Sequence, residues 1–492
     1  MLMLKFETSM GNKYAWEDDI GLFIPFSPIM DIIIKETSKD SPPSKDEIIE
    51  KLKMDFDISD IEYYYKLIKK LEQIKQNLII KEDHKIDCLE RSILKDGLNQ
   101  LTLEVTEDCN FRCIYCIYSE NYVYSRAHSK KYMNIDTAKK AIDHYFSLIK
   151  AGVEYNPSRK PSVAFYGGEP LLNFELIKEC VEYIKDVYKL YEVVYSITTN
   201  GSLLNKERAN WLMQNDFHIG VSISGPKAEH DRLRIYSNGN GTFCDIMENI
   251  RPIMDAGWDK IKSLVVIDWK TDLFKLEEFF SRNDVPPIAS VSTVGQIEGC
   301  KYYDKFTKND YTAFRNQLDQ ARIFYISKFR DTICERNLSF FGTIFGGSAV
   351  ECIHRPSSII PHSSLIPFTG ACIPGKKIFV SADGNYYACE RGNRGSPIGN
   401  NIEGIDFKKI KMLINNYINY LDKCPTCNMK RLCRKCYQNL TTDKCFIHTS
   451  KGCYEEEKSQ KELLAGAFLI CENCSEIAKK LLNEGNEDVF QT

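Results

Sequence analysis

The sequence has no stretch of about eighteen uninterrupted apolar residues, and its N-terminus lacks a basic segment followed by a long apolar one. It also has little excess charge, with a formal net charge of -3, and so no global basic field to hold nucleic acid. It contains no low-complexity tract and no repeat of about 20–50 residues. These absences predict a soluble, cytoplasmic protein whose partner is a small molecule, protein or peptide, with no nucleic acid and no membrane.

Cysteine, by contrast, is abundant, because the chain of 492 residues contains 19. Twelve of these lie between Cys334 and Cys474. Thiols stay reduced inside cells, so clustered cysteines there indicate metal or redox chemistry rather than a disulfide framework.

The N-terminal part of the chain has the pattern of a small separate module. KYAWED and IGLFIPF are strand candidates. Ser44 and Ser59 each begin an S-x-x-E pattern, in which side chains satisfy the free amides at the start of a helix. Strands followed by two capped helices predict a winged helix-turn-helix-like domain.

The central part alternates between strand and helix patterns and predicts an α/β fold. Its strand candidates are LNQLTLEVT, SVAFYGG, VVYSITTN, HIGVSISG, IKSLVVID and IASVSTVG. Six such units predict a parallel sheet wound as a partial (β/α)6 TIM barrel, with function at the C-terminal ends of the strands. A third part, rich in cysteine, contains a predicted hairpin, IFVSADGNYYAC, with its turn at Asp383 and Gly384. The domain boundaries expected from these changes are 1–95, 96–340, 341–470 and a C-terminal helix or tail at 471–492.

The polar motifs follow the first strands of the central part. CNFRCIYC, with Cys109, Cys113 and Cys116, follows the first strand, and GGEP, TTNG and SISGP follow the next three. Thiolates in groups of four hold iron–sulfur clusters or zinc. Three thiolates on a [4Fe–4S] cluster leave one iron open to a ligand that enters and leaves. The alternative is a zinc site completed by a distant Cys or His, but the loop has no second Cys pair nearby.

This combination of C-x₃-C-x₂-C and GGEP resembles the radical S-adenosylmethionine superfamily. The resemblance implies that the three cysteines hold a [4Fe–4S] cluster and that S-adenosylmethionine occupies its open iron. Reductive cleavage would then give a 5′-deoxyadenosyl radical that abstracts a hydrogen atom. The cofactor-binding residues that it implies are Tyr115, Gly167, Gly168, Glu169, Pro170, Asn200, Ser222 and Arg234.

The C-terminal cysteines are similar to the SPASM extension of that superfamily, which holds two auxiliary [4Fe–4S] clusters. The resemblance assigns Cys372, Cys389 and Cys436 to the first auxiliary cluster, and Cys424, Cys427, Cys433 and Cys453 to the second. Cys352 or a substrate thiolate would complete the first cluster. Zinc knuckles and buried thiols are the alternatives. Outside this scheme stand Cys445, Cys471 and Cys474, whereas Cys180, Cys244 and Cys334 have helical surroundings typical of small core residues.

The N-terminal pattern resembles the PqqD-like element that binds the leader of a ribosomally made precursor peptide. Together the three parts resemble maturases that crosslink such peptides, in particular those forming Cys thioethers of the sactionine or ranthipeptide type in clostridial Cys-rich peptides. An electron donor such as flavodoxin or ferredoxin is implied. The rivals are carbon–carbon crosslinking, a non-enzymatic redox sensor and an anaerobic sulfatase maturase. Sulfatase maturases resemble one another in having Asp where this chain has Glu390, which is a candidate catalytic base or merely a surface charge.

Overall fold

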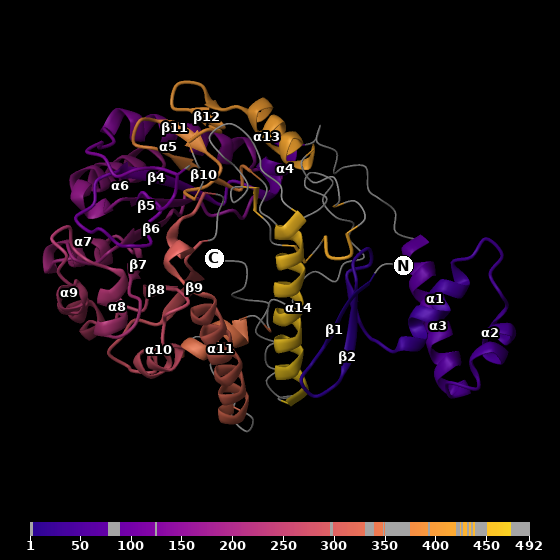
Figure 1. Ribbon diagram of the computed structural model, residues 1–492. Helices are drawn as coiled ribbons and strands as arrows, with labels where there is room; N and C mark the ends of the chain where they lie inside the picture. Colours follow the sequence, from indigo (N-terminus) through magenta and orange to yellow (C-terminus); the bar gives the residue numbers. More distant parts are fainter. Residues whose placement is uncertain are drawn as a thin grey trace.

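The computed structural model describes residues 3–76, 89–123, 125–295, 299–329, 339–347, 349, 374–391, 394–419, 424, 427–430, 432–433, 436–437 and 450–473. Its central feature is a sheet in which six parallel strands follow each other in chain order (Figure 1). These strands are β4 (Gln100–Thr106), β5 (Ser162–Gly167), β6 (Val194–Thr199), β7 (His218–Ser222), β8 (Ile261–Ile267) and β9 (Ile288–Thr293). They coincide with the six predicted strands, so the α/β fold with a parallel sheet is confirmed.

Helices connect these strands and lie along the outer side of the curved sheet (Figure 1). The elements from the linker to the end of the central part are α4 (Leu89–Asp96), α5 (Ile135–Ala151), η3 (Pro170–Asn173), α6 (Phe174–Val187), α7 (Lys206–Gln214), α8 (Lys227–Leu233), α9 (Phe243–Asp255), α10 (Leu273–Phe280), η4 (Tyr302–Lys305), α11 (Lys308–Phe329) and the π-helix η5 (Gly342–Gly346). None of the helices in the described part of the chain has the length and apolar character needed to span a membrane.

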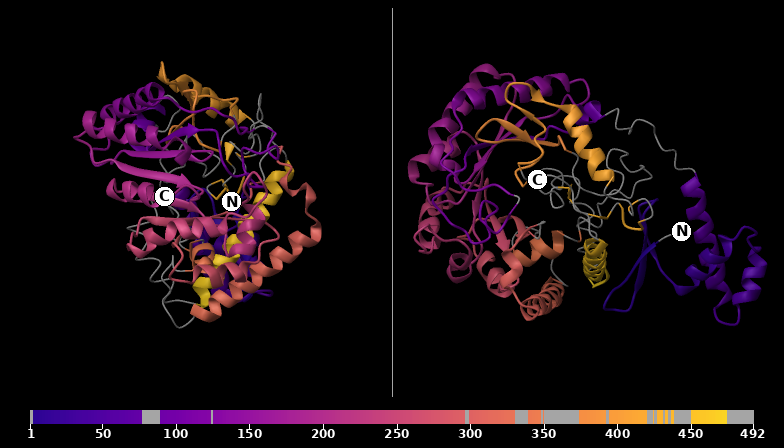
Figure 2. Two further views of the ribbon diagram at one scale, coloured as in Figure 1. Left: turned by 90° about the vertical axis from the view of Figure 1, so that its left-hand side faces the viewer. Right: turned by 45° about the horizontal axis from the view of Figure 1, so that its top comes forward.

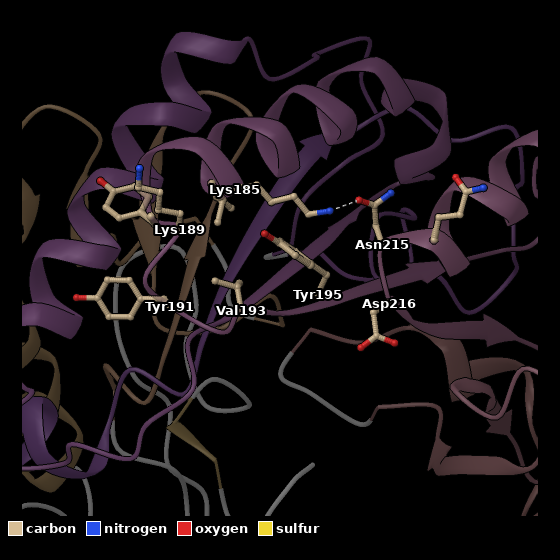
Figure 3. Close-up of a pocket in the computed structure, with 10 residues that line it drawn as sticks. Lys185, Lys189, Tyr191, Val193, Tyr195, Asn215 and Asp216 are labelled. Atoms are coloured by element: carbon tan, nitrogen blue, oxygen red, sulfur yellow. Dashed lines mark hydrogen bonds between the residues drawn. The ribbon is translucent and has the colours of Figure 1, made fainter.

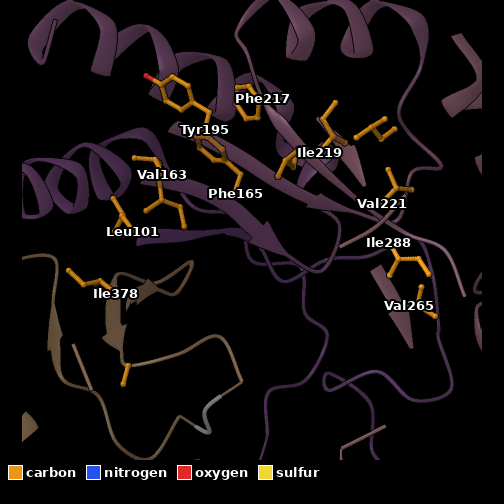
Figure 4. Packing of buried hydrophobic residues seen from close by; sticks show 14 of the residues in the cluster. Leu101, Val163, Phe165, Tyr195, Phe217, Ile219, Val221, Val265, Ile288 and Ile378 are labelled. Atoms are coloured by element: carbon orange, nitrogen blue, oxygen red, sulfur yellow. The ribbon is translucent and has the colours of Figure 1, made fainter. Parts of the chain in front are cut away.

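Strand β4 shows how the sheet separates its core from its site. Leu101, Leu103 and Val105 point into the main hydrophobic core, together with residues from the neighbouring strands such as Val163 and Phe165 (Figure 4). Because side chains alternate along a strand, Thr102, Glu104 and Thr106 point to the other face. All six are nevertheless buried, so the second face of β4 is covered as well.

The Cys-rich part extends the same sheet at the edge formed by β4. Strand β10 (Lys377–Val380) pairs in parallel with β4, and β11 (Asn385–Tyr387), β12 (Gly399–Asn400) and β13 (Gly404–Ile405) follow as antiparallel strands. Gly384 has φ +82 in the turn, which confirms the predicted hairpin. Helices α13 (Phe407–Asn419) and α14 (Ser450–Asn473) belong to this part, and α14 continues across the expected boundary at residue 470.

The N-terminal module is a three-stranded antiparallel sheet followed by three helices. Its elements are β1 (Met3–Glu7), β2 (Lys13–Glu17), β3 (Leu22–Pro25), α1 (Pro28–Thr37), α2 (Lys45–Leu52) and α3 (Ile58–Gln76). The capping box at Ser44 is present in full. The prediction that Ser59 caps a helix is wrong, because α3 already begins at Ile58 and the amides of Asp60 and Ile61 bond to the carbonyl of Asp57. Helix α1 was not predicted, since its isoleucine run favours a strand as much as a helix.

The small sheet of this module has two buried faces. Met3 and Ala15 join the core formed by α1, α2 and α3, whereas Leu4, Phe6 and Trp16 join the main core. Helix α14 lies beside β1 and β2 on that second face (Figures 1 and 2). Thus the N-terminal sheet is enclosed between its own helices and the C-terminal helix.

Candidate active site

The loop with the three closely spaced cysteines lies at the C-terminal end of β4, as predicted. Its backbone is fixed from across the sheet, because the amides of Arg112 and Ile114 donate to the carbonyls of Ile235 and Leu233 at 2.8 and 3.1 Å. Cys109, Cys113 and Cys116 are all partly buried. The fold therefore brings three thiols to the sheet edge where parallel α/β proteins bind ligands.

The surroundings of these thiols suit thiolate ligands. The amides of Phe111 and Tyr118 point at the sulfurs of Cys109 and Cys116, each at 3.4 Å. Burial nevertheless raises the pKa of all three thiols, that of Cys116 to about 12. Buried thiols of this kind become thiolates when a cation supplies the compensating charge.

The GGEP segment packs directly against the backbone of the cysteine loop. The amide of Gly168 donates to the carbonyl of Thr106 at 2.9 Å, and that of Glu169 to Asp108 at 2.8 Å. A Cβ atom would lie 2.1 Å from Thr106 O at Gly167 and 2.1 Å from Asp108 O at Gly168. Both glycines are therefore required for close approach to the loop, whereas the sequence suggested close approach to a ligand.

Glu169 links this segment to the end of β6. Its carboxylate accepts hydrogen bonds from the Leu171 amide at 3.0 Å, the Thr199 hydroxyl at 2.7 Å and the Asn200 amide at 2.7 Å. Burial raises its pKa to about 7, against the lowering effect of these donors. Pro170 is the first residue of η3, where it is also buried. A carboxylate has about four acceptor sites, so one remains for an ammonium group.

The other predicted cofactor-binding residues, Tyr115, Asn200, Ser222 and Arg234, also lie at this end of the sheet. The amide nitrogen of Asn200 lies 3.9 Å from Cys109 Sγ, and the Arg234 guanidinium lies over the Tyr115 ring with 5.2 Å to its centroid. Ser222 is the last residue of β7, but the nearby contact to Arg234 Nε comes from the Ser224 hydroxyl at 3.0 Å. Ser224 was not predicted, because a lone serine in a loop gives no distinctive signal.

Behind Arg234, a buried histidine orders the same segment. His230 Nδ1 accepts the amide of Ser224 at 3.3 Å, and its Nε2 lies 3.0 Å from the Thr242 hydroxyl. Burial, with the charge of Arg234, lowers the pKa of His230 to about 3. The imidazole is therefore neutral, and it fixes the segment that holds Arg234.

A buried group of charges connects the cysteine loop to the Cys-rich part, and it was not predicted. Arg126 Nη1 donates to Glu104 Oε1 at 2.9 Å, and the exposed fractions of these residues are 3% and 0%. Arg126 Nη2 donates to the carbonyl of Glu390, and Arg394 forms an ion pair with Glu107. These contacts hold Glu390, the residue after Cys389, close to the segment that follows the cysteine loop.

The cysteines of the C-terminal part are described only in part. Cys389 Sγ lies 3.3 Å from Glu390 Oε2, and Cys427 is close enough to Cys453 for their charges to interact. Burial raises the pKa of Glu390, but the charges of Lys377 and Arg391 and its hydrogen bonds outweigh burial and lower it. Cys424, Cys433 and Cys436 pack against the main core. Cys334, Cys352, Cys372, Cys445 and Cys474 lie outside the described residues.

Cys180 and Cys244, which are assigned to no cluster, were both predicted to be core residues. Cys180 in α6 is fully buried, as predicted. Cys244 in α9 is exposed, so its assignment to the core is wrong. Its position as the second residue of α9 places it outside the apolar stripe of Ile246, Ile250 and Ile253.

A separate cavity of about 310 Å³ lies at the opposite ends of the strands. Its lining includes Tyr188, Val193 and Tyr195, near the start of β6, and Asp216 (Figure 3). Because the cysteine loop follows the C-terminal end of β4, this cavity is not part of the cysteine site.

Comparison with known proteins decides the family of this arrangement. A family model described as the radical SAM superfamily matches residues 103–269. Residues 103–269 thus form a radical SAM domain, and the chain is an enzyme. The matched range begins within β4 and ends just after β8, so it includes the cysteine loop and GGEP.

Relatives extend this likeness beyond the matched range. A cysteine-type anaerobic sulfatase-maturating enzyme of Clostridium novyi is 25% identical over 391 residues, which cover 75% of this chain and 97% of the relative. An uncharacterised protein of Methanocaldococcus jannaschii is 36% identical over 155 residues, 32% of this chain and 48% of that protein. This second match thus spans about half of the relative's length.

The fold is also similar to a solved one. The structure of native anSMEcpe with bound AdoMet and Kp18Cys peptide superimposes with a TM-score of 0.54 at 20% identity, covering 79% of this chain and 99% of that chain. The likeness supports a radical SAM fold that includes part of the Cys-rich region.

The radical SAM family implies a [4Fe–4S] cluster and S-adenosylmethionine, and the residues present fit both. Cys109, Cys113 and Cys116 offer three buried sulfurs with amide donors directed at two of them. Among the described residues, no three His, Cys, Asp or Glu side chains are grouped closely enough to hold one metal ion. A four-iron cluster does not require such a group, since each thiolate binds a different iron.

Proposed function

We propose that the enzyme installs crosslinks, namely Cys thioethers, in a ribosomally made precursor peptide. The observation that carries this proposal is the combination of a radical SAM site with a separate N-terminal module. A quarter of this chain lies outside the match to the C. novyi relative, although that relative is matched over 97% of its length. The N-terminal module has a core of its own, and the edge of its small sheet is suited to hold a leader peptide as an added strand.

When bound, the first cluster and S-adenosylmethionine supply a 5′-deoxyadenosyl radical that abstracts a hydrogen atom, and auxiliary clusters supply a route for the surplus electron. The chain's own residues bind and orient. Glu169 offers its remaining acceptor site to the methionine ammonium, Arg234 its guanidinium to the carboxylate, and Tyr115 its ring to the adenine. Asn200 and Ser222 complete this edge.

We propose that Glu390 accepts the proton that leaves the peptide thiol. Its side chain touches Cys389 Sγ at 3.3 Å, and its carbonyl is held by Arg126. The balance of a thioether linkage is then complete: one hydrogen atom leaves carbon, one proton leaves sulfur, and one electron leaves the peptide. Each linkage lowers the peptide mass by two hydrogens.

In this proposal the central sheet is a partial (β/α)6 TIM barrel and the C-terminal part is a SPASM domain with two auxiliary [4Fe–4S] clusters. Cys372, Cys389 and Cys436 hold the first, with Cys352 or a substrate thiolate as its fourth ligand. Cys424, Cys427, Cys433 and Cys453 hold the second, which the proximity of Cys427 and Cys453 supports.

The leader peptide is proposed to bind as an added strand on β3. The amide of Phe26 bonds to Lys13 O, and Ile24 lies opposite Ala15 in the same register. Because bonded and non-bonded pairs alternate, Phe23 directs its amide and carbonyl away from β2. The other edge strand, β1, is contacted by Asn428, whose side chain donates to Met3 O at 3.2 Å. This difference favours β3 for β-strand addition.

A second candidate function, anaerobic sulfatase maturation, is favoured by the extent of the match to the C. novyi relative. The N-terminal module and Glu390 in place of Asp favour the peptide crosslinking enzyme. Formylglycine formation from Cys and thioether formation give different mass changes, so one measurement separates them.

Mass spectrometry of a Cys-rich precursor peptide, incubated with reduced enzyme and S-adenosylmethionine, tests the proposal. We expect loss of two hydrogens per linkage, only when the leader is attached, and no product from the variant with Cys109, Cys113 and Cys116 replaced by Ala. A sulfatase-derived peptide that loses SH₂ and gains oxygen at Cys would support the second candidate and contradict the first.

A further inference from the structure

Glu104 and Arg126 form an ion pair in the interior of the molecule. Glu104 lies on the site-facing side of β4, and its Oε1 accepts from Arg126 at 2.9 Å and from the Tyr118 hydroxyl at 2.6 Å. Its Oε2 accepts the amide of Ala382, on the C-terminal hairpin, at 3.2 Å. One carboxylate therefore receives donors from the cysteine loop and from the Cys-rich part.

The guanidinium of Arg126 also links the cysteine loop to the Cys-rich part. It lies between the rings of Tyr118 and Phe379, with 4.7 and 4.6 Å to their centroids. Its Nη2 donates to the carbonyl of Glu390. Tyr118 is two residues after Cys116, and Glu390 is one residue after Cys389. The pair thus joins the segments that follow one cysteine of each region.

Stability alone does not account for this pair. Removing two charges from water costs several kcal/mol per ion, and apolar replacements of buried ion pairs are often neutral or stabilising, by about 1–4 kcal/mol. Arg126 Nε is also buried without a hydrogen-bond partner, which adds to the cost. A buried pair of this kind specifies one arrangement of the groups that it joins.

We propose that Arg126, held by Glu104, is a positioning residue that fixes Cys389 and Glu390 relative to the loop carrying Cys113 and Cys116. The planar guanidinium sets both distance and direction, because it bonds a carboxylate and a carbonyl while stacked between two rings. This inference rests on the proposed function, in which Cys389 is a ligand of the first auxiliary cluster. Its role is to keep radical formation coupled to crosslinking.

The test compares Arg126→Met, Arg126→Lys and the apolar double variant Glu104→Leu/Arg126→Met, all as full-length holoenzymes. Arg159→Met is the matched control, because Arg159 also donates to two oxygens, here both main-chain carbonyls at 2.8 and 2.6 Å, and also has a buried nitrogen without a partner. Arg159 bonds Leu94 and Lys95, outside the site. The double variant keeps the test valid if a lone Glu104 prevents folding.

Two quantities are measured. The first is the number of crosslinks formed per 5′-deoxyadenosine released. The second is the spin–spin interaction between two reduced clusters, the one at the cysteine loop and the first auxiliary cluster. We expect Arg126→Met and the double variant still to release 5′-deoxyadenosine. The number of crosslinks formed per 5′-deoxyadenosine should fall by about 10- to 100-fold. Their spin–spin interaction should change, and Arg126→Lys should recover part of both. Arg159→Met should match wild type.

Unchanged coupling or an unchanged spin–spin interaction in Arg126→Met and the double variant would overturn the proposal. Failure of the proposed function would appear in wild type itself, as an absence of crosslinks, and the spectroscopic comparison needs no peptide. A wild-type enzyme without an auxiliary cluster at Cys389 would also overturn the positioning role.

Discussion

The N-terminal module and the C-terminal Cys-rich part are held to the rest of the molecule in different ways. The Cys-rich part is joined through main-chain hydrogen bonds, since β10 pairs with β4 from Lys377 opposite Gln100 to Val380 opposite Leu103. The module is joined through side chains. Phe468 of α14 packs against Phe6, Tyr14 and Phe23, and the module keeps a second core of its own.

This difference shows which part is fixed in register and which is separable. Strand pairing sets the position of β10 relative to β4 residue by residue, whereas Cys389 follows the end of β11 and depends on side-chain contacts as well. Side-chain packing at α14 has no such register. A module that must bind and release a leader peptide is suited to the second kind of attachment.

The largest effect should follow from breaking the ladder with Ile378→Pro. Strand β10 lies between β4 and β11, so each of its amides faces a neighbour, and Pro removes a bond from a fully paired strand. We expect a loss of about 3 kcal/mol or more in the free energy of unfolding. Hydrogen exchange should show lost protection in the central sheet and Cys-rich part, with the core of α1, α2 and α3 still protected.

Ile378→Val is the matched control, because it keeps the amide and should cost only about 0.5–1.5 kcal/mol. If the Pro variant unfolds at the same denaturant concentration as the Val variant, main-chain pairing is not what holds the Cys-rich part.

A smaller effect is expected for Phe468→Ala at the side-chain interface. The variant leaves three aromatic partners without their contact, which should weaken docking of the module by about 2–3 kcal/mol, since Phe468 is only partly buried. Calorimetry should resolve a separate early transition of the module, while the main transition stays in place. Tyr454→Ala, on the same helix and 71% exposed in wild type, should leave a single profile. One joint transition in both variants would mean that the module is not separable.

The smallest effect concerns acid sensitivity, which should differ between the radical SAM domain, where His230 lies in α8, and the N-terminal module. The pKa of His230 is lowered to about 3, mainly by burial, so the unfolded chain takes up its proton first and stability is lost as pH falls from about 6.5. At pH 5 this amounts to on the order of 2 kcal/mol, and His230→Gln should remove that pH dependence.

In the module, hydrogen bonds from Lys39 and Lys51 lower the pKa of Glu36 to about 2, so its contribution persists until the pH falls below about 4.5. Denaturant unfolding at pH 7 and pH 5, followed region by region through hydrogen exchange, compares wild type with the His230→Gln variant. Equal loss in both regions at pH 5 would show that His230 is not the acid-sensitive group.

Local patterns predicted a good part of the site. The strand before CNFRCIYC, the turn at Gly384 and the cap at Ser44 depend on neighbouring residues, and all three are confirmed. The prediction at Ser59 failed for a local reason, because Asp57 starts the helix instead. Helix α1 was missed because Ile32 to Ile34 suit either kind of element.

Local patterns could not predict the contacts among Glu104, Arg126 and Glu390. Glu104 and Arg126 are 22 positions apart, and Arg126 and Glu390 are 264 apart. Nothing in the sequence around either charged residue indicates that it is buried. Their partnership depends on which strand lies next to β4.

The sequence by itself determined the chemistry: three thiols on one loop, two glycines small enough to pass a neighbouring backbone, and strands whose side chains alternate between core and site. Those properties belong to a residue and its near neighbours. Only the tertiary structure decided that β10 lies beside β4, that Arg126 reaches Glu390, and that α14 closes the N-terminal sheet. Each of these joins distant segments, and burial of the whole surface selects it rather than any local preference.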